Sequence, residues 1–193
     1  MIEIIPVKKL NADISVPGSK YIANRLLIIC ALAKGSSVLR NVPRNDDIKA
    51  AIKALQQFGV DIKDNGDNLT IKGTEGKLKN PKSEINVRDS GTLLRFITSF
   101  AALADGKTTI TGSKRIQERP ISDLLKSLND LGVKCHATNN HAPIVINGNN
   151  FKGGKTKING NISSQFISSL LLAAPYAKND VKTLMRYTTN NFS

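Results

Sequence analysis

Three short stretches of this chain put small or hydroxylated residues directly ahead of apolar segments. They are PGSK at 17–20, RDSGT at 88–92 and NISSQ at 161–165. If each apolar segment is a helix, free backbone N–H groups and the helix dipole favour an anion at its start. The sequence therefore predicts three helix N-termini able to bind phosphate or carboxylate groups.

Basic side chains follow these stretches within a turn or two. Arg25 and Arg95 lie inside the apolar segments, where a guanidinium is costly unless it is paired. An anionic ligand would satisfy them, and Asp46 or Asp89 as an internal partner is the alternative. A second alternative is ordinary capping, because Ser, Thr, Asp and Gly before a helix usually only cap it.

The apolar segments that must position these residues cover 22–33, 93–104 and 166–177. They are apolar nearly all round, which is typical of helices inside a core. Their starts lie 71 and 73 residues apart, which indicates an internal repeat. Pro175 is expected to end or kink the third.

A second pair of segments shares this period. Residues 46–60 and 119–133 have apolar residues at helical spacing and a Gly near the end, so we expect amphipathic outer helices. Strand-like stretches with Asn- and Gly-rich turns follow both of them, which predicts hairpins.

The predicted fold is α/β, a pseudo-threefold repeat of βαβαββ-type units with buried parallel helices and outer sheets. Two units are complete, and a third begins within 156–181. We expect a domain over 19–181, preceded by short strands in 1–18 around Ile2, Ile4, Ile14 and Val16. Residues 182–193 are expected to be a disordered or unrelated tail.

The composition limits the classes of function. The chain has 193 residues and a net charge of +13, which favours phosphorylated or polyanionic partners. Apolar runs are too short for a membrane span, and the N-terminus has no signal-peptide pattern, so a cytoplasmic location is expected. Cys30 and Cys135 are predicted to be reduced, partly buried thiols. His136 and His141 lack metal-ligand spacing with them, and we expect neither a metal nor a cofactor.

Four stretches together resemble a known family. They are PGSK–YIANR (17–25), DSGTLLRF (89–96), ERPISDLL (118–125) and SSQF (163–166). In this order and spacing they are similar to the signature stretches in the first half of EPSP synthases. The resemblance implies one domain of the two-domain enolpyruvyl transferase fold. It also implies transfer of the enolpyruvyl group of phosphoenolpyruvate to the 5-hydroxyl of shikimate 3-phosphate, in the shikimate pathway to aromatic amino acids.

The resemblance also implies roles for individual residues. The phosphoenolpyruvate contacts would be Lys20, Gly91, Thr92, Arg119 and Gln165, where the herbicide glyphosate would compete. The shikimate 3-phosphate contacts would be Lys20, Tyr21, Arg25, Ser163, Ser164 and Gln165. Arg95 would support the glycine loop, and Lys20 is the catalytic candidate within this chain.

Three departures from the family pattern matter. Tyr21 stands where the family usually has Ser, and Asp89-Ser90 where it has Asn-Ala. The family chain is more than twice as long, and its main proton-transfer residues lie in the half beyond this sequence. The strands expected in residues 1–18 would normally pair with that second domain. We therefore expect this chain to bind substrate but to need the second domain for a closed active site and turnover.

Three other interpretations remain open. The sister transferase acting on UDP-N-acetylglucosamine has a catalytic Cys ahead of its Arg-Pro motif, which GSKRIQERP (112–120) lacks. A nucleic-acid-binding module would fit the charge, but aromatic residues are only 5% and no RNA-binding signature is present. The third is a folded remnant that binds shikimate 3-phosphate without catalysis. We expect small-molecule substrates, with no nucleic acid or membrane partner.

Overall fold

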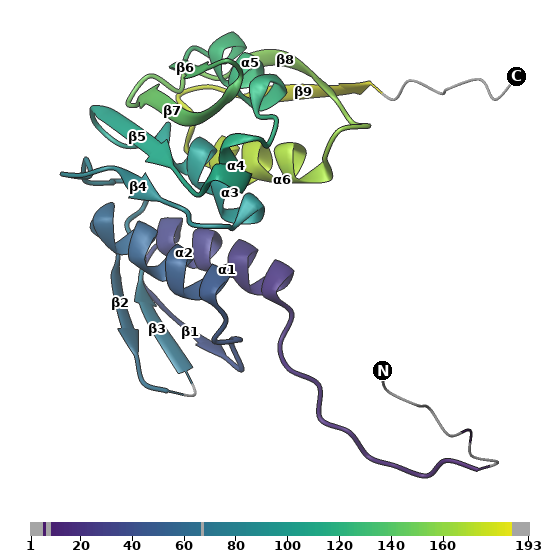
Figure 1. Cartoon of the computed structure of the whole chain (residues 1–193). Coiled ribbons are helices and arrows are strands. Elements are labelled where there is room, and N and C mark those ends of the chain that lie inside the picture. Colours follow the sequence, from purple (N-terminus) through teal and green to yellow (C-terminus); the bar gives the residue numbers. More distant parts are fainter. Residues whose placement is uncertain (1–5, 7–8, 67, 187–193) are drawn as a thin grey trace, which may run out of the picture.

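The computed structural model describes residues 6, 9–66 and 68–186. Helices fill the interior, and three small sheets lie on the outside (Figure 1). Within the described residues, one continuous apolar cluster joins the helices to the inward faces of the sheets. The α/β prediction is confirmed.

The first unit follows the expected order of elements. Helix α1 (Lys20–Leu32) leads to strand β1 (Ser36–Arg40), helix α2 (Asp46–Gln57) and the hairpin β2 (Asp61–Asp64) and β3 (Asn68–Lys72). The strands form an antiparallel sheet in the order β1-β3-β2. Helix α2 buries one apolar face, and its chain reverses at Gly59, whose φ is +86°. A left-handed residue after a helix is the expected C-terminal signal.

The second unit repeats this order with two additions. Its elements are β4 (Ile85–Asn86), α3 (Gly91–Ala101), β5 (Lys107–Thr111), α4 (Lys114–Gln117), α5 (Ser122–Asp130), β6 (Lys134–Thr138) and β7 (His141–Asn147). The sheet order is β4-β5-β7-β6, and β4 pairs with β5 in parallel. The short β4 and α4 were not predicted, because two and four residues carry almost no periodic signal.

The third unit contains β8 (Gly154–Asn159), α6 (Ser164–Ala173), the 3-10 turn η1 (Ala174–Tyr176) and β9 (Val181–Arg186). Pro175 ends the α-helix as predicted. Strand β9 pairs in parallel with β8. The prediction of a disordered tail from residue 182 is therefore wrong for 182–186, and residues 187–193 lie outside the described residues.

Residues 9–18 form no strand within this chain. Ile14 and Val16 are highly exposed there, while Ile2 and Ile4 lie outside the described residues. The expected strands were to pair with a second domain, so they stay a prediction. The prediction of a fully buried first helix is wrong. Helix α3 is buried except at Gly91 and Arg95, whereas α1 exposes an apolar side.

The two cysteines are buried and free. Burial raises the pKa of the Cys135 thiol to about 12. No helix in the described part of the chain is both long and apolar enough to cross a bilayer.

Candidate anion-binding site

Serine residues begin the three inner helices. Ser19, Ser90 and Ser163 each accept a hydrogen bond from a backbone N–H in the first turn, at 3.5, 3.3 and 3.2 Å. The capping interpretation is thus correct for these hydroxyl groups. Each cap satisfies one N–H of the first turn and leaves the helix dipole unchanged, so capping and anion binding are compatible at these ends.

Gln165 joins the first turns of α6 and α3. Its side-chain oxygen accepts a 3.0 Å hydrogen bond from Arg95, and its nitrogen donates to the Thr92 hydroxyl at 3.2 Å. Arg95 also donates to the carbonyl oxygen of Gly91 at 2.9 Å. Four residues predicted for the site therefore form one hydrogen-bonded cluster.

Arg95 carries the charge of this cluster in a half-buried position. Burial lowers the pKa of its guanidinium from the ordinary value, and the positive charge of Arg119 lowers it further. Its Nε is buried and has no hydrogen-bond partner among the described residues. The Phe166 ring lies against the guanidinium, 5.3 Å from its central carbon. An arginine stays charged near neutral pH, so Arg95 and the exposed Arg119 repel each other.

Arg25 connects α1 to α6 by a different route. It donates to the carbonyl oxygen of Tyr21 at 3.0 Å and to the Ser168 hydroxyl at 3.1 Å. Its guanidinium lies over the Phe96 ring at 5.1 Å. These contacts hold the guanidinium without neutralising it.

Lys20 differs from the three arginines because it has a carboxylate partner. Its ammonium lies 3.2 Å from a carboxylate oxygen of Asp47, in the first turn of α2. The same ammonium is 5.4 Å from the centre of the Tyr21 ring. Within the described residues, Lys20 and Tyr21 make no hydrogen bond to the Gln165 cluster.

The acidic residues considered as internal partners are engaged elsewhere. Asp89 accepts a 2.5 Å hydrogen bond from Ser113, and Asp46 pairs with Lys49 at 3.8 Å. Within the described part of the chain, no ion pair forms at Arg25, Arg95 or Arg119. Asp46 and Asp89 are therefore not the internal partners of the arginines, so that alternative is wrong. The arginines keep their positive charge for a ligand.

Two serines that the sequence analysis did not single out support the arginines. Ser168 holds Arg25, and the buried Ser169 hydroxyl lies 2.5 Å from the Arg95 carbonyl oxygen and 2.6 Å from the Ser99 hydroxyl. A polar residue in an apolar helix is a usable signal for such a contact, because it needs a partner there. The predicted Ser164 is exposed, and its carbonyl accepts from Ser168.

The hydrogen-bonded cluster leaves little room for a side chain at Gly91, the first residue of α3. A Cβ added to Gly91 would lie 3.1 Å from an Arg95 side-chain nitrogen. At the start of α1, a Cβ on Gly18 would lie 2.2 Å from the Asn41 carbonyl oxygen, so glycine is required there for close backbone packing. Both glycines fix where a helix begins relative to its neighbours.

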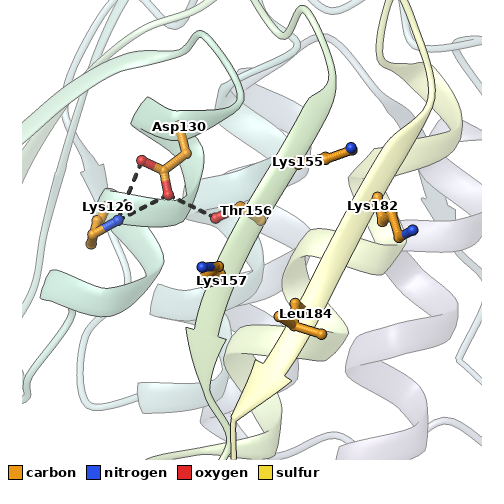
Figure 2. Close-up of a pocket in the computed structure, with 7 residues that line it drawn as sticks. All are labelled: Lys126, Asp130, Lys155, Thr156, Lys157, Lys182 and Leu184. Atoms are coloured by element: carbon orange, nitrogen blue, oxygen red, sulfur yellow. Dashed lines mark hydrogen bonds and ion pairs between the residues drawn. The ribbon is translucent and has the colours of Figure 1, made fainter.

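An open cavity of about 450 Å³ lies away from this cluster, beside α5 and the β8–β9 sheet. Figure 2 shows the residues that line it, with Lys155, Lys157 and Lys182 on the strands and Asp130 bonded to Lys126 and Thr156. None of the predicted site residues line it. The residues predicted for the site therefore lie outside this cavity.

Comparisons with known proteins agree on a family. The profile of EPSP synthase (3-phosphoshikimate 1-carboxyvinyltransferase) matches residues 4–189. A 3-phosphoshikimate 1-carboxyvinyltransferase of Methanospirillum hungatei is 46% identical, and the match covers 86% of this chain and 39% of the relative. One of Methanocella arvoryzae is 40% identical, with 96% and 44% covered.

A solved structure shares the fold. EPSP synthase from Acinetobacter baumannii superposes with a TM-score of 0.82 at 25% identity, over 92% of this chain and 41% of that one. The chain thus spans about two fifths of the length of the relatives that it matches. From the profile match over most of its length, the chain belongs to the EPSP synthase family.

Proposed function

We propose that this chain forms the anion-binding wall of a 3-phosphoshikimate 1-carboxyvinyltransferase site. The complete enzyme would transfer the enolpyruvyl group of phosphoenolpyruvate to the 5-hydroxyl of shikimate 3-phosphate, releasing phosphate. Family membership and the names of the relatives support this reaction. The chain matches only part of those relatives, so the activity of the complete protein is a proposal.

The unneutralised charge of Arg95, which donates to the Gly91 carbonyl oxygen and to Gln165, is the observation on which the proposal depends. Burial and, to a smaller extent, the positive charge of Arg119 lower the pKa of Arg95, and neither arginine forms an ion pair within the described residues. A phosphate group between them would relieve the repulsion and accept charge-assisted hydrogen bonds from both. A purely structural arginine would be expected to have an acidic neighbour.

Phosphoenolpyruvate would bind at the first turn of α3. Gly91 and Thr92 would cradle its phosphate, Arg119 and Lys20 would bind its charged groups, and Gln165 would lie between the two substrates. The bond from Arg95 to the Gly91 carbonyl supports a role for Arg95 in holding this turn in place. Lys20 would have to exchange its Asp47 partner for substrate.

Shikimate 3-phosphate would bind where α1 meets α6. Arg25, Ser163, Ser164 and Gln165 are the proposed contacts, together with Lys20 and Tyr21. The Ser168 hydroxyl accepts from Arg25 and donates to the Ser164 carbonyl oxygen, so it positions Arg25 for this group. Tyr21 is half exposed, so its phenol is free to reach a sugar phosphate at the end of α1.

A titration of the purified chain tests the binding proposal. Shikimate 3-phosphate should shift the backbone amide resonances of residues 163–166, and phosphoenolpyruvate those of 91–95. Arg119→Ala should weaken phosphoenolpyruvate binding by about tenfold, an effect typical of a lost charge-assisted bond. Arg115→Ala, at an exposed position on α4, is the matched control and should bind as the wild type does. Absence of any shift at millimolar ligand would rule the proposal out.

A turnover assay tests whether catalysis needs residues that this chain lacks. The Asp/Glu and Lys residues expected to transfer protons lie beyond this sequence, so the chain alone should release no phosphate above background from the two substrates. Phosphate release well above background would show that these 193 residues suffice for catalysis.

A further inference from the structure

Arg119 is a proposed phosphate ligand whose position the Gln165 cluster does not explain. It lies two residues after α4, outside any helix or strand, and its side chain is exposed. Its backbone N–H donates to the Ile116 carbonyl oxygen at 3.0 Å, which closes the last turn of α4. A helix of four residues is only marginally stable by itself, so contacts from other elements must fix where Arg119 lies.

His141 makes such a contact. Its ring Nδ1 lies 3.1 Å from the backbone carbonyl oxygen of Arg119, 22 residues away in sequence. A carbonyl oxygen can only accept, so Nδ1 carries a proton and donates this hydrogen bond. Both the charged ring and the neutral ring with its proton on Nδ1 can donate in this way. The bond therefore holds Arg119 in either charge state of the ring.

The β6–β7 hairpin determines where the His141 ring lies. His141 is the first residue of β7, and Asn139 and Asn140 form the two-residue loop before it. Both loop residues have positive φ angles, +51° and +65°, which is the signature of the tightest turn between antiparallel strands. Strand β7 also packs against α4. A short hairpin thus carries the ring beside the segment that it holds.

The start of α4 is bonded to the loop that begins α3. Ser113, which precedes α4, does not cap it with its side chain but donates its hydroxyl to Asp89 at 2.5 Å. The Ser113 N–H also donates to the Arg88 carbonyl oxygen at 3.0 Å. Between the two ends, the Ile116 side chain is 1% exposed. Residues 113–119 are therefore bonded to other elements at both ends and buried in the middle.

We propose that His141 is a positioning residue for Arg119, and that the bond between Ser113 and Asp89 is the second anchor of the same segment. The positive charge of Arg119 acts on Arg95, whose pKa it lowers after the larger effect of burial. Anchoring keeps the Arg119 guanidinium within reach of Arg95 before a ligand arrives, which reduces the loss of conformational freedom on binding. This inference rests on the proposed function, since it assigns Arg119 to the phosphate of a ligand.

Hydrogen exchange of the free chain tests the anchoring without a ligand. His141→Ala should speed exchange of the Arg119 amide by about tenfold, because the end of the segment is released. His141→Asn should restore slow exchange, since its side-chain N–H is the same number of bonds from the backbone as Nδ1. His136→Ala, at an exposed position on β6 of the same hairpin, is the matched control and should exchange as the wild type does.

A titration with phosphoenolpyruvate tests the consequence for binding. His141→Ala and Ser113→Ala should each weaken binding by about threefold to tenfold, while His141→Asn and His136→Ala should stay within about twofold of the wild type. In an Arg119→Ala background, His141→Ala should cause no further loss, because the group that it positions is absent. A general effect on folding would instead weaken binding in both backgrounds.

Two results would overturn the proposal. One is an Arg119 amide that exchanges in His141→Ala as slowly as in the wild type. The other is an equal loss of binding in the presence and in the absence of the Arg119 side chain. Thermal melting checks that each variant is folded. Absence of phosphoenolpyruvate binding by the wild type would refute the proposed function, whereas hydrogen exchange would still decide whether His141 holds Arg119.

Discussion

Arg95 donates a 3.0 Å hydrogen bond to the side-chain oxygen of Gln165, and this bond joins the first turns of two helices 70 residues apart in sequence. Gln165 in turn donates to Thr92. One neutral side chain thereby orients a cation and a hydroxyl without cancelling the positive charge. A carboxylate in its place would orient them too, but it would neutralise the cation.

Two substitutions of Gln165 distinguish its role in orienting the Arg95 side chain from the effect of a negative charge beside Arg95. Gln165→Glu should pair with Arg95 and lower phosphate affinity by at least about tenfold, because a charge-assisted bond is worth roughly 1.5–3 kcal/mol. Gln165→Met, of similar shape but without charge, should cost only about threefold. Phosphate titration followed by amide resonances measures both. Wild-type affinity in the Glu variant would contradict the role of Arg95 charge.

Gly91 offers a test of the position of the guanidinium. A Cβ there would meet the Arg95 side chain at 3.1 Å, so Gly91→Ala should displace it and weaken phosphate binding by about threefold to tenfold, with little loss of stability. Gly35→Ala should do the reverse. Its φ is +82° and no atom of the described residues lies within 4 Å of the added carbon, so this variant should lose roughly 1 kcal/mol of stability and bind phosphate normally. Phosphate titrations and denaturant curves of both variants decide the matter.

The sequence predicted the order of elements well, because helices such as α2 and α5 carry a strong amphipathic period and end at glycines. It failed at β8 and β9, whose parallel pairing joins residues far apart in sequence. It also failed at α1, where an all-round apolar pattern could not reveal which neighbour covers each side.

The sequence indicated which residues of the candidate site would lie together, but not all of their partners. Gly91, Arg95 and Gln165 were all expected there, and they meet. The pairing of Lys20 with Asp47 was not foreseen, because it depends on how α1 and α2 pack. Ser168 was missed for the same reason, since its contact with Arg25 crosses from α6 to α1.

Cys135 gives a prediction about pH. Burial raises its pKa from 9.0 to about 12, so the folded state holds the proton more tightly than the unfolded state. The resulting stability is fully present below pH 9 and is lost as pH rises toward 12. Denaturant curves of Cys135→Ala should therefore lose less stability over this range than the wild type, by up to about 1.4 kcal/mol per pH unit. Cys30→Ala is the control, and a fall in Cys135→Ala as steep as that of the wild type would contradict the assignment.

The ion pair between Lys20 and Asp47 predicts a gain in binding on mutation. Asp47 lies 3.2 Å from the ammonium and competes with any anion for it. Asp47→Asn should free Lys20 and tighten phosphate binding by about threefold, while costing less than about 1 kcal/mol of stability because the pair is partly exposed. Asp46→Asn removes the adjacent carboxylate, which pairs with Lys49, and should leave phosphate affinity unchanged. Titrations at low ionic strength give the clearest comparison, since salt screens such charges. Equal tightening in both variants would mean that general loss of negative charge, rather than release of Lys20, governs the affinity.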